Sequence, residues 1–121
     1  MIYVRYNIDL LNSDLQTYEL IWSVEKGKEW ASFPGKYVSD YKFVLCAICL
    51  NNTVRTGVMI PAGLLTLNST QYPLHVHFIF TDAAGNVHDD IAYFSGRNNL
   101  FAINTQKIES DGYTATIYGI K

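Results

Sequence analysis

The chain ends in DGYTATIYGIK, residues Asp111–Lys121, in which a glycine turn is followed by a strict alternation of side chains. Odd-numbered residues from Tyr113 to Gly119 fall on one face of an extended segment, and even-numbered residues from Thr114 to Ile120 fall on the other. Both faces carry bulky or β-branched side chains, which is typical of a strand covered on both sides. We therefore expect the chain to close on a well-covered β-strand.

Turn residues divide the rest of the chain into similar segments, and no segment shows a convincing amphipathic helix. About eight strands in a chain of this length predict one all-β domain over residues 1–121, an antiparallel β-sandwich of the jelly-roll type. The segment 30–34 is predicted to be extended or irregular, and 62–71 to be a loop. Before the closing strand, the predicted strands are Met1–Ile8, Tyr18–Val24, Tyr41–Leu50, Val54–Ile60, Leu74–Thr81, Val87–Phe94 and Leu100–Thr105.

The composition indicates a folded domain with few surface charges. Of 121 residues 49% are apolar and only 17% are charged, and the net charge is −2. This balance predicts no basic face for nucleic acid, and no apolar run reaches the roughly 18 residues of a membrane helix. The N-terminus shows no pattern of a secretion signal. A surface of amides, hydroxyls and phenols suits carbohydrate stacking or broad protein contacts, although a β-rich composition alone favours Tyr and Thr.

The two cysteines form a C-x-x-C pattern, Cys46 and Cys49, inside the most hydrophobic predicted strand, Tyr41–Leu50. We expect this strand to be central and buried on both sides. Residues three apart on a strand point to opposite faces and lie about 10 Å apart along it. They can neither form a disulfide nor share one zinc ion from there. The sequence thus predicts two buried free thiols.

Three histidines are the candidate metal ligands. His75 and His77 share a strand face, but pairing around a hairpin loop at 82–86 places His88 about four residues away along the ladder. We expect no metal site and no cofactor, and the sequence leaves open whether the three histidines meet in space. Asp89 and Asp90 are adjacent and face opposite ways, so they cannot form the facing carboxylate pair of a glycosidase. We therefore predict no catalytic residues and no enzyme.

Aromatic residues are the remaining candidates for a binding site. Trp30, Phe33 and Tyr37 lie close together in the sequence and outside the strongest strand patterns. A partly exposed cluster of this kind can stack on a sugar ring or anchor a protein interface. The alternative is a hydrophobic plug that closes one end of the sandwich.

Four motifs, in this order, resemble the C-terminal β-sandwich domains of phage and prophage tail fibres and related virion proteins. They are SDYKFVL at Ser39–Leu45, VMIP at Val58–Pro61, GRNN at Gly96–Asn99 and the closing IYGI at Ile117–Ile120. The likeness spans residues 37–121. It implies a protein of the virion, made in the cytoplasm of the bacterial host and usually homotrimeric. Such modules usually end a long fibre, whereas this one makes up nearly the whole chain, which suggests a stand-alone tip, an adaptor or a capsid decoration protein.

Three functions follow as hypotheses. In the first, a non-enzymatic tail-fibre tip or receptor-binding module recognises a bacterial surface glycan through Trp30, Phe33 and Tyr37. In the second, a capsid decoration or tail adaptor protein uses the same aromatics in contacts with other virion proteins. The third is a small glycan-active enzyme, which requires two close carboxylates or a metal. Self-association would also cover edge strands that the low surface charge protects weakly.

Overall fold

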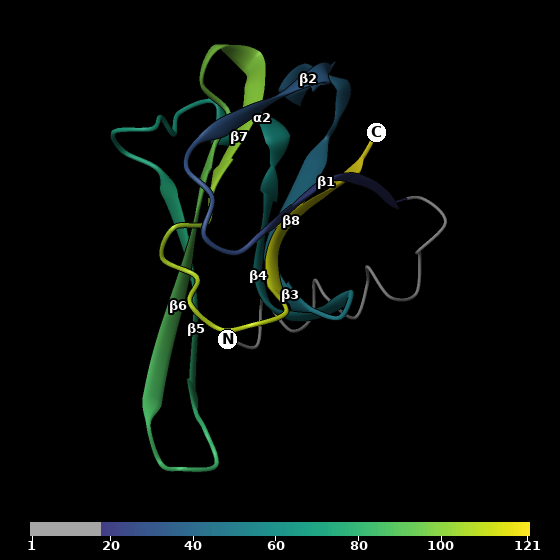
Figure 1. Cartoon of the computed structure of the whole chain (residues 1–121). Helices are drawn as coiled ribbons and strands as arrows, with labels where there is room; N and C mark the ends of the chain where they lie inside the picture. Colours follow the sequence, from purple (N-terminus) through teal and green to yellow (C-terminus); the bar gives the residue numbers. More distant parts are fainter. Residues whose placement is uncertain (1–17) are drawn as a thin grey trace.

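The structure, a computed structural model, describes residues 18–121, and the predicted strand Met1–Ile8 lies outside them. These residues form an antiparallel β-sandwich of two four-stranded sheets that face each other (Figure 1). The all-β fold class predicted from the sequence is therefore confirmed. Within the described part of the chain, no helix is long and apolar enough to cross a membrane.

The strands of the two sheets are interleaved along the chain: β1, β3, β4 and β8 form one sheet, and β2, β5, β6 and β7 form the other. Sheet A has the order β1-β8-β3-β4 and sheet B the order β2-β7-β6-β5. Strands near the two ends of the chain therefore pair with each other, β1 with β8 and β2 with β7, while β3–β4 and β5–β6 are hairpins. The bounds are β1 Tyr18–Glu25, β2 Ala31–Tyr37, β3 Phe43–Leu50, β4 Thr53–Pro61, β5 Leu74–Thr81, β6 Val87–Ser95, β7 Leu100–Asn104 and β8 Tyr113–Ile120.

Two segments are more regular than predicted. Ala31–Tyr37 is a strand, β2, although Pro34 and Gly35 break its pairing with β7. The expected loop 62–71 begins with one helical turn, α2 (Ala62–Leu65), which buries Leu65 completely. A single turn is too short to show a helical period in the sequence, which is why the pattern gave no sign of it. Two short 3₁₀ turns, η2 (Val38–Asp40) and η3 (Arg97–Asn99), complete the elements.

The closing strand β8 is well covered, as expected, because it lies between β1 and β3 in sheet A. Its alternation is visible in the burial of its side chains: Ala115 and Ile117 are fully buried between the sheets. Gly119 lies on the same face of β8, at a position where no side chain fits. A Cβ atom there would overlap the Tyr41 ring and come within 2.7 Å of Cδ1 of Ile21.

The predicted central strand, β3, is buried on both faces. Cys46 belongs to the core between the sheets, whereas Cys49 joins Leu45 and Ala47 in a second apolar cluster on the other face of sheet A. Both thiols are free, and burial raises the pKa of each. The prediction of two buried free thiols on opposite faces is confirmed, and the raised pKa of each disfavours the reactive thiolate.

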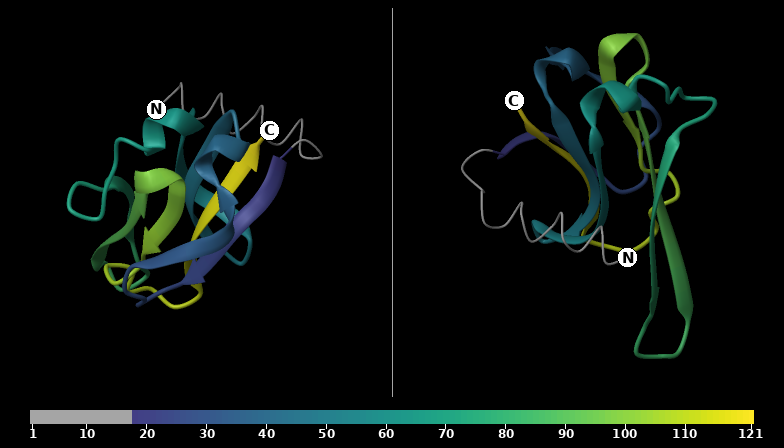
Figure 2. Two further views of the ribbon diagram at one scale, coloured as in Figure 1. Left: turned by 90° about the horizontal axis from the view of Figure 1, so that it is seen from above. Right: turned by 180° about the vertical axis from the view of Figure 1, so that it is seen from behind.

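The β5–β6 hairpin projects beyond the rest of the sandwich at one end (Figures 1 and 2). Aromatic rings stabilise its inner face: Phe80 stacks on His88 at 4.8 Å and on Tyr113 at 5.8 Å, measured between ring centroids. At the tip, Oδ1 of Asp82 accepts hydrogen bonds from the backbone N–H groups of Ala84 and Asn86, both at 2.9 Å. Its Oδ2 lies 2.8 Å from Nε2 of His88.

These contacts make the tip sensitive to acid. The His88 contact, followed by the backbone hydrogen bonds, lowers the pKa of Asp82 from 3.8 to about 2. Because the folded pKa is depressed, ionised Asp82 stabilises the hairpin above about pH 4, and this contribution is lost as the pH falls through about 2. We expect the ¹³C carboxyl resonance of Asp82 to titrate with a midpoint near 2, and to move upward in His88→Ala. A wild-type midpoint near the ordinary value would contradict the contacts at the tip.

Candidate functional site

A row of four polar and aromatic side chains crosses the outer face of sheet B. His75 on β5 is paired with Tyr93 on β6, and Tyr93 is paired with Asn104 at the end of β7. Ala31 opens β2 opposite Ile103, so Trp30, one residue earlier, comes next to Asn104. The four residues belong to distant parts of the sequence, and the sheet register brings them into one line.

This row lines a pocket of about 290 Å³, close to the lower end of the range for ligand pockets, which begins near 300 Å³. The rings of His75 and Tyr93 pack in a T-shaped contact with 4.8 Å between their centroids. The remaining walls come from the loop before β5 and the loop after β7. Besides the row, the lining residues are Thr70, Gln71, Pro73, Gln106 and Lys107.

Thr105 holds the two chain segments that carry the pocket. Its hydroxyl donates to the carbonyl of Glu25 at 2.6 Å and accepts from the N–H of Lys28 at 2.9 Å. Its backbone N–H donates to the Lys28 carbonyl, and its carbonyl accepts from Gly27, both at 2.8 Å. Thr105 is fully buried, so these four bonds fix the turn that leads into Trp30 against the end of β7.

The amides of the pocket are also held in place. Asn104 donates from Nδ2 to Oε1 of Gln106 at 2.9 Å, and its Oδ1 accepts from the Gln106 backbone N–H at 2.9 Å. This local loop sets the direction of the Gln106 side chain, which is exposed at the pocket wall. Each amide keeps unused hydrogen-bonding capacity, because an amide offers two donors and an acceptor with two lone pairs.

A second hollow of about 220 Å³ continues the pocket along the same face. Thr70 lines both, and Ala102 lies on the outer face of β7 two residues before Asn104. We call the two hollows together the outer groove. Its second half is lined mainly by hydroxyl and polar groups, namely Ser32, Ser69, Thr70, Ser95, Arg97, Asn98, Leu100 and Ala102.

The outer groove carries positive charge only. Lys107 lines the first half and Arg97 the second, and no Asp or Glu lines either half. Neither cation forms an ion pair with another residue of the range 18–121. An anionic group placed in the outer groove would therefore meet two uncompensated positive charges and no carboxylate.

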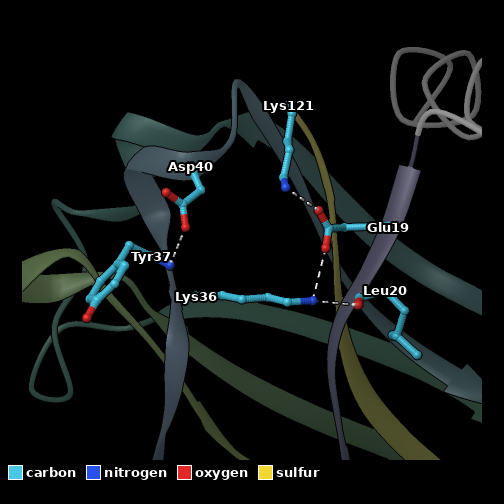
Figure 3. Close-up of polar contacts among 6 residues, drawn as sticks. All are labelled: Glu19, Leu20, Lys36, Tyr37, Asp40 and Lys121. Atoms are coloured by element: carbon cyan, nitrogen blue, oxygen red, sulfur yellow. Dashed lines mark hydrogen bonds and ion pairs between the residues drawn. The ribbon is translucent and has the colours of Figure 1, made fainter.

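Of the three residues predicted to form a stacking platform, only Trp30 lines the outer groove. Phe33 contacts Trp22 of sheet A with 5.4 Å between ring centroids and packs on the core. Phe33 thus has the role of the hydrophobic plug that was the alternative. Tyr37 is half-exposed at the end of β2 and lines neither hollow, and its backbone N–H donates to Oδ2 of Asp40 at 2.9 Å (Figure 3).

The three histidines do not converge on one point. The rings of His75 and His77 are 6.1 Å apart, but Nδ1 of His77 lies 2.9 Å from Oδ1 of Asp89, while His88 binds Asp82 at the hairpin tip. Between residues 18 and 121, no group of three His, Cys, Asp or Glu side chains lies close enough to hold a metal ion.

The two adjacent aspartates, Asp89 and Asp90, point opposite ways, as predicted. Asp89 is on the outer face with His77, whereas Asp90 is buried and its Oδ1 accepts from the N–H of Glu109 at 3.0 Å. The pair is therefore not the facing pair of carboxylates that glycoside hydrolysis uses.

Several groove residues were not singled out from the sequence. Tyr93, Asn104 and Gln106 are spread over 14 positions with no shared motif, and Lys107 stands in a turn. The one available signal was the strand alternation that put His75 on the exposed face of β5.

No protein-family model, no curated protein and no solved structure matches the chain. The resemblance to phage tail-fibre domains therefore stays a prediction. The function is therefore inferred from the geometry of the outer groove.

Proposed function

We propose that the protein is a non-enzymatic binding module whose outer groove holds an acidic oligosaccharide. The observation that carries this proposal is the combination of rings, amides and unpaired cations in two adjacent hollows that share Thr70. In keeping with the resemblance, the oligosaccharide belongs to a bacterial surface and the module to a virion. The predicted alternative, a capsid decoration or tail adaptor protein, draws its support from the resemblance alone.

Rings and amides account for recognition of a sugar. The apolar face of a pyranose packs on an aromatic ring, and Trp30 and Tyr93 offer two rings in the pocket. Sugar hydroxyls both donate and accept hydrogen bonds, which matches the mixed capacity of Asn104, Gln106 and Gln71. Because Thr105 and the sheet fix Trp30, Tyr93 and Asn104 before binding, these three residues lose little side-chain entropy when the ligand enters.

The two positive charges of the outer groove explain why the proposed oligosaccharide is acidic. Lys107 and Arg97 lie in the two halves of the outer groove, so a chain with carboxylates on successive or alternate sugars meets a cation in each half. A neutral glycan would use the rings and amides but gain nothing from the two cations. Binding of the acidic form is therefore expected to weaken with added salt, because exposed charges are screened.

A glycan array that pairs acidic sugars with their neutral counterparts tests the proposal. We expect the wild type to bind acidic members, and Trp30→Ala to bind them at least about fivefold more weakly, since an aromatic anchor contributes about 1–3 kcal/mol. Tyr37→Ala is the matched control: it removes an exposed aromatic ring of the originally predicted platform that lies outside the outer groove.

Each possible result tests a different part of the proposal. Unchanged binding by Trp30→Ala, or loss in Tyr37→Ala, would move the site away from the outer groove. Equal binding of acidic and neutral partners would remove the role of Lys107 and Arg97 and leave glycan binding standing. No binding to any glycan by the folded wild type would overturn the proposed function.

A further inference from the structure

Three of the four edge strands of the sandwich carry features that hinder pairing with another strand. Edge strand β1 has an extra residue, Ile21, that interrupts its register with β8, and β4 has one at Arg55 opposite β3. Edge strand β2 loses its pairing at Pro34 and Gly35. Bulges, proline and edge charges are the means by which natural sheets avoid joining at their edges.

The rim between β1 and β2 is also closed by side chains. Nζ of Lys36 donates to Oε2 of Glu19 at 2.9 Å and to the carbonyl of Leu20 at 3.5 Å, and Lys121 reaches Oε1 of Glu19 at 3.4 Å (Figure 3). The Lys36 hydrogen bond is the largest of the effects that lower the pKa of Glu19, so the carboxylate is charged at neutral pH. This network occupies the rim where another strand would have to dock.

Edge strand β5 has none of these features. Its eight residues, LHVHFIFT, pair with β6 in eight consecutive steps without a shift. It contains no Pro, Gly, Lys, Arg, Asp or Glu, and Ile79 on its outer face is 64% exposed. Its far half lies on the projecting hairpin, away from the body of the sandwich (Figure 2). A long, regular, uncharged edge of this kind is a template for a further strand.

We propose that β5 pairs antiparallel with β5 of a second copy of the chain, so that the two B sheets become one continuous sheet. An antiparallel pair of identical strands is an isologous contact around a two-fold axis, which closes a dimer. The open backbone donors and acceptors of each edge are then satisfied by the other.

The sequence of β5 is complementary to itself in this arrangement. With Phe78 on the axis, Phe78 faces Phe78, Val76 faces Phe80 and His77 faces Ile79 of the second copy. Aromatic and β-branched residues are the cross-strand pairs that stabilise antiparallel sheets. No acidic or basic residue other than histidine stands on the strand itself, and Arg55 of β4 lies over the inward-facing Phe78 ring, 5.4 Å from its centroid. A second copy is therefore the partner that the edge fits.

The dimer has a consequence for the outer groove, which rests on the proposed function. The two-fold axis of an antiparallel pair stands perpendicular to the sheet, so the outer faces of both B sheets point the same way. His75 of β5 lines each groove, so the two sites lie on either side of the shared edge. Two sites on one face bind a repeating surface polymer with higher avidity than one site does.

The mass of the full chain in solution, measured by light scattering over a wide range of concentration, tests the proposal. We expect about twice the chain mass of 13.7 kDa for the wild type. The double variant His77→Lys/Ile79→Lys puts like charges opposite each other across the shared edge, and its mass is expected to fall to that of one chain. Leu67→Lys/Val87→Lys is the control, because it adds the same two charges at exposed positions outside the edge strand.

Circular dichroism shows whether each variant is folded before its mass is interpreted. A wild type that stays monomeric at the highest concentration would overturn the proposal. So would a trimer, which the tail-fibre resemblance implies, or a folded double variant that remains a dimer. Glycan binding by a monomeric wild type would leave the proposed function intact while removing the paired edge.

Discussion

Ile117→Asp is expected to leave the chain unfolded. Ile117 is fully buried on β8, where it pairs with Trp22 on one side and Cys46 on the other. Truncating a buried isoleucine costs about 2–5 kcal/mol, and an unpaired buried carboxylate adds several more. The total stability of a domain is about 5–15 kcal/mol, so the sum is comparable with the whole of it. Circular dichroism and the soluble yield check the result.

Val87→Asp is the control for that substitution. Valine and isoleucine are both β-branched, but Val87 is 71% exposed on β6, and a substitution there is expected to change stability by less than about 0.5 kcal/mol. Soluble, folded Ile117→Asp protein with a stability near that of Val87→Asp would contradict the placement of β8 in the centre of sheet A.

Gly119→Ala is expected to destabilise the protein by about 1–3 kcal/mol, the typical cost of forcing extra atoms into a packed core. The new Cβ would overlap the Tyr41 ring and press on Ile21. Neither side chain has room to move, because Tyr41 is buried beside Phe101, with 5.9 Å between ring centroids, and Ile21 is buried in the same core. The free energy of unfolding, measured in urea, gives the cost directly.

Gly63→Ala is the matched control, since a Cβ atom at Gly63 meets nothing within 4 Å. Gly63 lies inside α2, where alanine is preferred over glycine by roughly 0.5–1 kcal/mol. We therefore expect this substitution to be neutral or slightly stabilising. Equal effects of the two substitutions would mean that Gly119 is not packed as the structure has it.

The burial of Tyr41 also has an ionisation consequence. Burial first, and the nearby Glu19 carboxylate second, raise the pKa of Tyr41 to about 12. The phenol therefore stays neutral over the whole range in which the protein is handled, and its ring covers the Gly119 backbone as an uncharged group.

The strands could be predicted because side-chain alternation reports directly on which faces of a strand are buried. In β8, Tyr113 to Gly119 mark the core face, and in β3 the continuous apolar run marks burial on both sides. The pairing of β1 with β8 could not be predicted, because alternation within a strand carries no information about its neighbours. The helical turn α2 could not be predicted, because a single turn is too short to show a helical period in the sequence.

The candidate site is only partly foreshadowed by the sequence. Trp30, Phe33 and Tyr37 were grouped because they lie close together in the sequence and outside the strongest strand patterns, and of the three only Trp30 lines the outer groove. The register of β2 puts Phe33 on the inner face with Trp22, away from Trp30. The partners that Trp30 does have, Tyr93 and Asn104, lie at least 60 positions away and meet it through sheet pairing.

The direct test of the central claim uses the two tryptophans as reporters. Trp30 lines the outer groove and Trp22 packs on Phe33 between the sheets, so a ¹⁵N–¹H spectrum has one indole N–H signal at the site and one away from it. On titration with the tightest-binding acidic oligosaccharide from the array, we predict that the Trp30 signal shifts, together with the side-chain amides of Asn104 and Gln106, while the Trp22 signal stays in place. A Trp30 signal that does not move, with shifts gathered elsewhere on the molecule, would contradict the account.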